Sequence, residues 1–382
     1  MATQRLDQLS EHFANKKTKK TIIGFKNPED VVIVSALRTP ITRAYKGGLK
    51  DTKVERLLYC IISGVIEQAG IDPKIITELV IGTVNTLGGG VALGRMAMLH
   101  AGIPDSASVV SINRHCASGL QAVAQLASAI RDGTTDVGIA AGVESMTSYF
   151  QKIKLLREDC DESSLENPLV EDCLLPMGIT SENVATQFGV SRQKQDQFAL
   201  RSHQKASYAQ KNGLFKEEIL PVKTKVKDAK GNVLEVIVSE DDGIRHDATL
   251  QSLGSLKPAF KPDGASTAGN SSQVSDGAAA VLLMKRKKAT ELGLPIIGKF
   301  ITSAVVGVPP SIMGVGPAYA IPEAVKKAGI TINDLDVVEL NEAFASQALY
   351  CIEKLGLDPN RVNPKGGAIA FGHPLGCTGA RL

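Results

Sequence analysis

The 382-residue sequence contains no tryptophan, and aromatic residues make up only 4% of it. No apolar run approaches the length of about 18 residues that indicates a membrane-spanning helix. The net charge is only +3, and no basic stripe interleaved with aromatic residues points to nucleic-acid binding. With 43% apolar and 22% charged residues, the composition is typical of a globular protein, and the length favours two or more domains.

Cysteine is also sparse, and its spacing excludes two further classes of protein. The six cysteines show neither metal-ligand spacing nor the density of a disulfide framework. They are Cys60, Cys116, Cys160, Cys173, Cys351 and Cys377. This pattern predicts no metal site and favours a reducing compartment.

One cysteine lies where a strand is expected to turn into a helix. The apolar run Val109–Ile112 is typical of a buried strand, and apolar residues from Leu120 to Ile130 recur at helical spacing before a stop at Gly133. Cys116 falls at the turn between them. Free backbone N–H groups and the helix dipole there favour a thiolate, which can attack a carbonyl group. The alternative is that Cys116 is simply a small buried hydrophobic residue.

Three short motifs favour the nucleophile. They read Asn113-Arg114-His115-Cys116-Ala117-Ser118-Gly119, Asn341-Glu342-Ala343-Phe344-Ala345 and Gly372-His373-Pro374. In type, order and spacing they resemble the motifs of the thiolase family, most closely those of its peroxisomal 3-ketoacyl-CoA thiolases, from about Asp30 to the end. The resemblance implies CoA-dependent cleavage of a 3-ketoacyl-CoA to acetyl-CoA and a shortened acyl-CoA in fatty-acid β-oxidation. CoA and 3-ketoacyl-CoA are then substrates, and no cofactor or metal is implied.

The resemblance also assigns roles within the active site. Cys116 is the nucleophile that becomes acylated. His373 activates Cys116 and donates a hydrogen bond to a substrate oxygen. Asn341 holds a water molecule that completes the oxyanion site, and Glu342 assists this network. Asn341 can also be the N-cap of a helix over residues 341–355.

Four further residues are expected to bind substrate. Met177 lies in a segment that resembles the family's CoA-binding loop, and Ser272 matches a serine near the pantetheine. Met313 and Phe344 would line the acyl pocket. Each of these residues can instead be a packing residue, since Met and Phe are found first of all in cores.

Strands alternate with helices along the chain, which predicts an α/β fold with parallel sheets between helix layers. The second half weakly repeats the first. Its expected strands are Ile297–Val306, Asp336–Leu340 and Val362–Phe371, and its expected helices are Pro317–Ala328 and Asn341–Leu355. The thiolase architecture implied is a duplicated αβαβα core with an inserted loop domain. We divide the chain into a flexible targeting arm (1–29), an N-terminal half (30–147 and 265–290), a loop domain (148–264) and an incomplete C-terminal half (291–382).

The second half is expected to be truncated. Family members continue past the histidine motif to a Cys-x-Gly segment whose cysteine acts as acid and base. Cys377-Thr378-Gly379 matches those letters, but its context places it in the histidine loop, so a packing role is favoured. One alternative function is therefore a truncated, inactive or weakly active isoform that binds acyl-CoA or pairs with a full-length subunit. Another is a ketoacyl synthase, which would want a second histidine near the nucleophile.

The N-terminal arm is basic and contains a possible import signal. Arg5, Leu6, His12 and Phe13 resemble the R-L-x5-H-[LA] peroxisomal targeting signal, from which Phe13 departs. On a helix, Leu6 and Phe13 share one face, as a helix docked on an import receptor would need. The expected location is the peroxisome and the expected assembly is a homodimer. The alternative for this arm is a frayed amphipathic tail.

Overall fold

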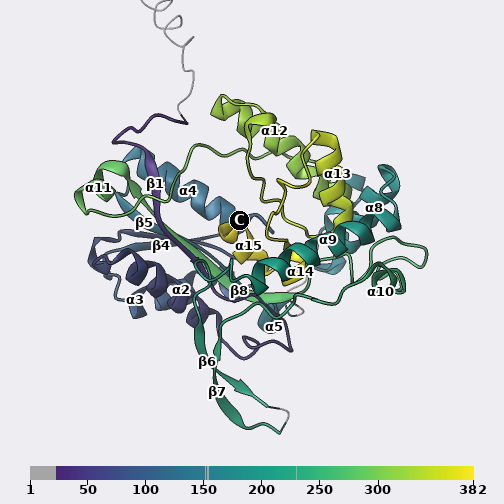
Figure 1. The fold of residues 1–382 in the computed structure, drawn as a ribbon, viewed down its shortest axis with the longest axis horizontal. Helices are drawn as coiled ribbons and strands as arrows, with labels where there is room; N and C mark the ends of the chain where they lie inside the picture. Colours follow the sequence, from purple (N-terminus) through teal and green to yellow (C-terminus); the bar gives the residue numbers. More distant parts are fainter. Residues whose placement is uncertain (1–22, 151, 153–154, 229) are drawn as a thin grey trace, which may run out of the picture.

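The computed structural model of the chain describes residues 23–150, 152, 155–228 and 230–382. Most of the first half folds into one seven-stranded sheet with the order β4-β3-β5-β8-β1-β9, in which β2 pairs with β8 (Figure 1). Its strands are β1 (Val31–Arg38), β2 (Thr42–Arg43), β3 (Glu78–Gly82), β4 (Ser108–Ile112), β5 (Val137–Ser145), β8 (Ser275–Lys285) and β9 (Gly298–Lys299).

This sheet is mixed, so the expectation of purely parallel sheets is wrong. β3 runs parallel to β4 and β5, but β8 runs antiparallel to β5 and β1. The reason lies in the register, which places Ser145 at the end of β5 opposite Asp276 at the start of β8. Residues 146–274 therefore leave and re-enter the sheet at the same end of its strands. They connect β5 to β8 as a hairpin loop does, and not as a crossover.

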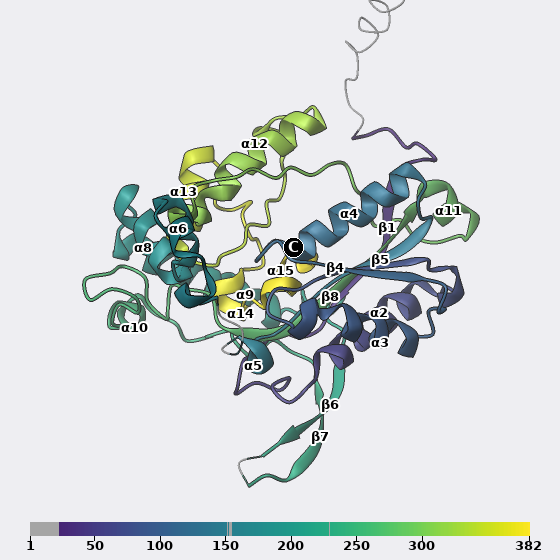
Figure 2. The same ribbon diagram turned by 180° about the vertical axis from the view of Figure 1, so that it is seen from behind.

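Helices cover both faces of the sheet. They are α2 (Val54–Ala69), α3 (Val91–His100), α4 (Ser118–Asp132) and α11 (Arg286–Glu291), with short 3-10 turns η2 (Pro73–Ile75) and η3 (Leu87–Gly90). Figure 2 shows α4 on one side of the sheet and α2 and α3 on the other. Leu57, Ile61 and Val65 recur at helical spacing on α2 and are fully buried, each contributing about 1.5–3 kcal/mol. α4 buries Val123, Leu126 and Ile130 against the opposite face.

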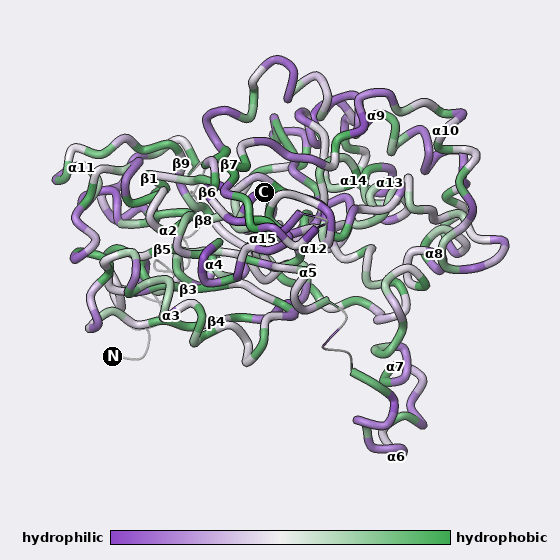
Figure 3. Tube along the Cα trace, turned by 90° about the horizontal axis from the view of Figure 1, so that it is seen from below, coloured by the Kyte–Doolittle hydropathy of each residue, from purple (hydrophilic) through white to green (hydrophobic). Residues whose placement is uncertain are grey.

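The segment between β5 and β8 carries mostly helices. Its elements are α5 (Met146–Tyr149), η4 (Arg157–Asp159), α6 (Glu162–Leu165), α7 (Pro168–Glu171), η5 (Asp172–Leu174), α8 (Met177–Gln187), α9 (Arg192–Lys211), β6 (Val222–Lys227), β7 (Val233–Val238) and α10 (Leu250–Gly254). α6 and α7 project from the body in Figure 3, and the β6–β7 hairpin projects in Figure 1. As expected, the hydroxyl of Ser191 caps α9 by accepting a hydrogen bond from the backbone N–H of Lys194.

The second half contains helices but no sheet of its own among the described residues. Its elements are η6 (Pro310–Val315), α12 (Gly316–Ala328), η7 (Ile332–Asp334), α13 (Ala345–Leu355), α14 (Ala368–Phe371) and α15 (Leu375–Arg381). The helix expected from Pro317 is confirmed as α12. α15 lies against α4 on one face of the sheet, while α12 and α13 lie farther out (Figures 1 and 2).

The three strands expected in this half are therefore wrong. Within residues 297–306 only β9 is a strand, and it extends the first sheet by pairing with β1. Residues 336–340 and 362–371 share a single bridge, Val338 to Val362, and residues 368–371 are helical. A strand persists when neighbours satisfy its backbone groups. β3 lies between β4 and β5, whereas residues 336–340 have one bridging neighbour in the described chain.

Candidate active site

Cys116 lies in a tight turn between β4 and α4, as the sequence predicts. The residue before it, His115, has a φ of +46°, a left-handed conformation that is uncommon for a residue other than glycine. Two side chains hold this turn. The Asn113 Oδ1 atom accepts a hydrogen bond from the His115 backbone N–H (2.9 Å), and the Ser118 hydroxyl accepts one from the Arg114 N–H (2.9 Å). Backbone strain held in this way is a common feature of functional turns.

Glycines let the start of α4 approach both β3 and α15. A Cβ atom on Gly119 would lie 2.5 Å from the carbonyl oxygen of Gly376, which lies in the first turn of α15. A Cβ atom on Gly82 would collide with the backbone of Ser118. The N-terminal ends of α4 and α15 therefore meet at the carboxyl end of β3, and each of these ends carries one of the sequence-predicted catalytic residues.

The Cys116 side chain is half-buried, and its surroundings favour the neutral thiol. Burial and, to a smaller extent, the nearby Glu144 carboxylate raise the pKa of Cys116 to about 11. The backbone N–H of Cys116 acts in the opposite direction. The backbone N–H group thus favours the thiolate as expected, but burial and Glu144 outweigh it.

His373 is buried and fixed at both ring nitrogens. Its Nδ1 atom lies 2.6 Å from the hydroxyl of Thr378, and its Nε2 atom lies 3.2 Å from Nδ2 of Asn341. The Thr378 hydroxyl donates to the carbonyl of Pro374, so its oxygen accepts from Nδ1–H. This assigns the lone pair to Nε2. Burial, with a contribution from Arg381, lowers the pKa of His373 to about 3.

Asn341 contacts His373, but it does not cap a helix. α13 begins at Ala345, with Phe344 at its N-cap position, so the alternative role of Asn341 as a cap is wrong. The reason is that residues 341–344 are held by backbone pairing with the segment before β8: the Ser272 N–H donates to the Ala343 carbonyl. Asn341 Oδ1 is buried and has no protein partner among the described residues, which leaves it available to a water molecule or a substrate.

Glu342 belongs to a different hydrogen-bond network from His373. Its carboxylate accepts from the Ser202 hydroxyl on α9 (2.6 Å), from Asn363 Nδ2 (2.8 Å) and from the Ile369 N–H (3.3 Å). Burial raises the pKa of Glu342, while these donors lower it. Glu342 thus anchors the loop that leads to His373, and the idea that it assists the oxyanion network directly is not supported.

The expected substrate-binding residues lie close to one another at α8 and α13. Met177 begins α8 and is 43% exposed, and the next residue, Gly178, contacts Phe260. The ring of Phe260 meets that of Phe344 edge to face, with centroids 5.9 Å apart. Ser272 is bonded to the Ala343 carbonyl, beside Phe344.

Met313 joins this group through η6, which packs against α8. The η6–α8 contact includes a hydrogen bond from the Asn183 side chain to the Ser311 carbonyl (3.0 Å). Met313 itself is half-buried. The fold therefore brings the four candidate substrate residues to one region. One of them, Phe344, follows Asn341 by three residues.

Two functional contacts were not anticipated from the sequence. Glu144, at the end of β5, is fully buried and accepts backbone hydrogen bonds from Val84, Asn85 and Gly376. A charged residue at the end of the apolar strand pattern 137–143 is a signal that could have identified it. Thr378, the partner of His373, carries no such signal.

Cys377 is buried in α15, and burial raises the pKa of its thiol to about 12. This supports the packing role expected for it.

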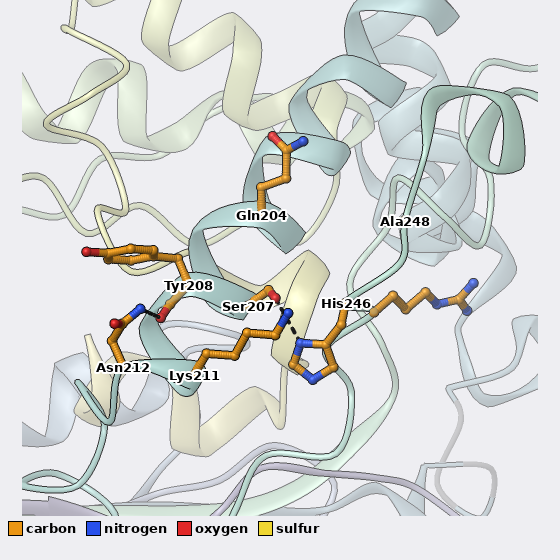
Figure 4. A pocket seen from close by; sticks show the side chains of 8 residues that line it. Gln204, Ser207, Tyr208, Lys211, Asn212, His246 and Ala248 are labelled. Atoms are coloured by element: carbon orange, nitrogen blue, oxygen red, sulfur yellow. Dashed lines mark hydrogen bonds between the residues drawn. The ribbon is translucent and has the colours of Figure 1, made fainter.

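The structure also contains a surface pocket away from this site. Figure 4 shows a pocket of about 280 Å³ in which the Ser207 hydroxyl lies 2.8 Å from Nδ1 of His246. Its lining residues are Gln204, Ser207, Tyr208, Lys211, Asn212, Arg245, His246 and Ala248. None of the residues singled out from the sequence lines it.

The described residues lack two kinds of feature. No helix among them is long and apolar enough to cross a membrane, and no group of three His, Cys, Asp or Glu side chains there could hold a metal ion. The proposed targeting residues Arg5, Leu6, His12 and Phe13 lie outside the described part of the chain.

Comparisons with known proteins identify the family of the chain. The thiolase N-terminal domain family matches residues 31–287, and the thiolase C-terminal domain family matches residues 294–382. The chain is 56% identical over 357 residues to 3-ketoacyl-CoA thiolase B, peroxisomal, of rat, an alignment that covers 92% of this chain and 82% of the relative. The chain belongs to the thiolase family.

Solved structures confirm the thiolase-like α/β fold expected from the sequence. The chain is similar to the dimeric peroxisomal thiolase of Saccharomyces cerevisiae, with a TM-score of 0.87, 48% identity and coverage of 94% and 90% of the two chains. A second yeast structure, a peroxisomal 3-ketoacyl-CoA thiolase, is a five-layered A-B-A-B-A structure built from two core domains of identical topology. Its TM-score is 0.75, at 44% identity and with coverage of 93% and 89%.

Proposed function

We propose that this chain is a peroxisomal 3-ketoacyl-CoA thiolase, an acyltransferase of fatty-acid β-oxidation in which Cys116 is the nucleophile and His373 the base. The observation that carries the proposal is the contact between the first turns of α4 and α15 at Gly119 and Gly376, which brings the two motif loops to one place. The family membership and the name of the rat relative support it.

The first half-reaction cleaves the carbon–carbon bond of the substrate. As the Cys116 sulfur bonds to the 3-keto carbon, the thiol proton passes to Nε2 of His373, and the carbonyl oxygen becomes an oxyanion. Thiol and imidazole are both neutral at rest, so proton transfer accompanies the attack. Collapse of the oxyanion breaks the bond between carbons 2 and 3. Carbon 2 leaves with the electron pair as the acetyl-CoA enolate and takes up the proton held on Nε2 of His373, which returns the imidazole to its neutral form.

The second half-reaction transfers the acyl group to CoA. The CoA sulfur bonds to the acyl carbon, the bond to Cys116 breaks, and the CoA thiol proton ends on Cys116. Asn341, whose Oδ1 atom is buried without a protein partner, is placed to hold a water molecule at the oxyanion. One hydrogen-bond donor at such a site contributes about 10²–10³-fold to the rate.

The substrate region follows from the residues gathered at α8 and α13. Phe344 and Met313 supply apolar surface for the acyl chain, while Met177 and Ser272 flank the CoA arm. CoA and 3-ketoacyl-CoA are substrates here, and both carry the same pantetheine arm.

Location and assembly extend this proposal. Arg5, Leu6, His12 and Phe13 would deliver the chain to a peroxisomal import receptor, and a homodimer would match the dimeric yeast thiolase. A fluorescent fusion tests the arm: the full sequence should label peroxisomes, and a variant lacking residues 1–29 should remain outside them. Equal peroxisomal labelling by both would overturn this part of the proposal.

The test of the activity is thiolysis of acetoacetyl-CoA and of a long-chain 3-ketoacyl-CoA by the purified chain. Turnover with parallel-line ping-pong kinetics is the expected result. The alternative function, acyl-CoA binding without turnover, predicts saturable binding of both substrates and no release of acetyl-CoA. The named activities of the relatives favour turnover over this alternative.

A further inference from the structure

Glu144 is a buried carboxylate that joins three segments of the chain. It is the second-last residue of β5 and has no exposed surface. Its Oε2 atom accepts hydrogen bonds from the backbone N–H of Val84 (3.0 Å) and of Gly376 (3.1 Å), and its Oε1 atom accepts one from Asn85 (3.0 Å). The Thr83 hydroxyl also donates to Oε1 (3.4 Å). Every contact is a donor, which suits an ionised carboxylate, and these donors lower the pKa of Glu144 against the larger raising effect of burial.

On one side, these contacts lead to the turn that carries Cys116. The carbonyl of Val84 accepts a hydrogen bond from Asn113 Nδ2 (3.2 Å), and Asn113 Oδ1 accepts one from the N–H of His115 (2.9 Å). Cys116 is the next residue. The strained φ of His115 is thus held by Asn113, which is held in turn by a peptide bonded to Glu144.

On the other side, the contacts lead to His373. Gly376 lies in the first turn of α15, three residues after His373. Thr378, in the same helix, accepts the hydrogen bond from His373 Nδ1–H. A continuous path of hydrogen bonds therefore runs from the Cys116 turn through Glu144 to the helix that orients the His373 ring.

We propose that Glu144 is a positioning residue that fixes the spacing between the Cys116 turn and the His373 helix for thiolysis. This role rests on the proposed function. No substrate atom need touch Glu144, because the residue acts through the two loops. A displacement of about 1 Å between reacting groups can cost on the order of 10²-fold in rate.

The charge of Glu144 gives the proposal a second readout. Its carboxylate raises the pKa of the Cys116 thiol, after the larger effect of burial. The other titratable groups nearby are Arg114 and His115 on the Cys116 turn, with His373, Cys377 and Arg381 on the α15 side. Removing the carboxylate charge should therefore make Cys116 react as a thiolate at lower pH.

Three variants separate the effect of the Glu144 charge from the effect of its hydrogen bonds to the two loops. E144Q removes the charge. It also breaks at least one backbone hydrogen bond, because the amide N–H2 group of glutamine cannot accept from a backbone N–H. E144D keeps the charge but is one methylene too short to reach both Val84 and Gly376. The control is D276N: Asp276 starts β8 next to β5, is equally buried, and bonds to Thr147 instead of the catalytic loops.

The full-length chain is assayed for thiolysis and for iodoacetamide alkylation of Cys116 between pH 6 and 11. For E144Q we expect kcat to fall about 30–100-fold, KM to change less than about threefold, and the alkylation midpoint to drop by about half a pH unit or more. E144D should lose kcat similarly with an unshifted midpoint. D276N should keep kcat within about threefold of wild type and the alkylation midpoint within about 0.2 pH unit.

Wild-type kcat in both Glu144 variants, or a kcat loss in D276N as large as theirs, would overturn the proposal. If E144Q does not fold, the comparison of E144D with D276N still shows whether the hydrogen bonds of Glu144 to the two loops are needed for thiolysis. Absence of thiolysis in the wild-type chain would instead refute the proposed function, and the alkylation profiles would still report whether Glu144 controls the Cys116 thiol.

Discussion

The side-chain amide of Asn341 lies 3.2 Å from Nε2 of His373, on the side of the ring opposite the hydroxyl of Thr378. The ring is therefore held between two fixed groups, and its tautomer is set by Thr378. Nε2 is therefore the unprotonated ring nitrogen, and its lone pair faces the Asn341 amide N–H2 group. A neutral imidazole with a fixed tautomer needs no ionisation before it acts as a base.

Replacing Thr378 by valine should impair catalysis by freeing the imidazole. T378V leaves Nδ1–H of His373 without a buried acceptor, so we expect kcat to fall about tenfold and the free energy of unfolding to fall by about 1–3 kcal/mol. The measurements are thiolysis and urea unfolding.

The matched control is T135V, which removes a buried hydroxyl that bonds to Thr77 far from the site. T135V should lose stability but keep kcat. Equal kcat for T378V and T135V would show that Thr378 does not orient the base.

The close contact of the two helix ends gives a second prediction. In G119A the new Cβ would lie 2.5 Å from the Gly376 carbonyl oxygen, so α15 must shift. We expect a loss of about 1–3 kcal/mol in the free energy of unfolding and at least a tenfold loss of kcat, although alanine is the better helix former.

The control G254A is in α10, where a Cβ meets nothing within 4 Å. It should be neutral or stabilising by up to about 1 kcal/mol. Thermal melting and thiolysis of the two variants settle the point, and an unaffected G119A would contradict the packing described for α4 and α15.

Buried neutral histidines predict how stability depends on pH. Burial lowers the pKa of His203 from 6.5 to about 4, with Arg245 and His246 contributing. Between these values the unfolded chain binds a proton that the folded chain does not, so stability falls as pH falls from 6.5 to 4 and is fully present above 6.5. The lowered pKa of His373 likewise reduces the stability of the folded chain as the pH falls.

H203N tests this because asparagine can still accept the Arg245 N–H hydrogen bond through its oxygen. Urea unfolding of wild type and variant from pH 7.5 to 4 is the measurement. The stability difference between them should change by about 2–3 kcal/mol across that range, with the wild type losing more on acidification. A constant difference would mean that His203 is not buried as a neutral ring.

Phe344 should affect substrates according to acyl length. F344L removes the edge-to-face contact with Phe260 and part of the apolar surface proposed for the acyl chain. We expect KM for a long-chain 3-ketoacyl-CoA to rise about tenfold and KM for acetoacetyl-CoA to rise less than about threefold.

F188L is the control, since the half-buried Phe188 contacts Tyr350, with the two rings tilted by 35° and their centroids 4.1 Å apart. It should change neither KM. A uniform rise of both KM values in F344L would place Phe344 at the CoA arm and not at the acyl chain.

Local features of the site could be predicted from the sequence, because they depend on neighbouring residues. The strand before Cys116, the helix after it and the stop at Gly133 are all encoded within 25 residues, and Gly133 adopts the left-handed conformation of a C-cap. The burial expected for that strand is wrong, because β4 lies at the edge of the sheet and is only half-buried. Long-range pairing could not be predicted. The antiparallel direction of β8 depends on where a long insertion returns, and Glu342 is tied to Ser202, 140 residues away.

Asn341 illustrates the same limit. Its identity and the periodicity that follows it favour a helix cap, but tertiary pairing of Ala343 with Ser272 keeps residues 341–344 out of the helix. The strands expected at 336–340 and 362–371 have strand-like composition. Composition alone does not provide the neighbours that would satisfy their backbone groups.

The central claim is that Cys116 carries the acyl group between the two half-reactions. The most direct measurement is mass spectrometry of the chain after brief incubation with acetoacetyl-CoA in the absence of CoA. We predict one acetyl adduct per chain, mapped to the Cys116 peptide, removed by added CoA and absent from C116S, while C60S retains it. An adduct on another cysteine, or CoA-dependent turnover in C116S, would contradict the account.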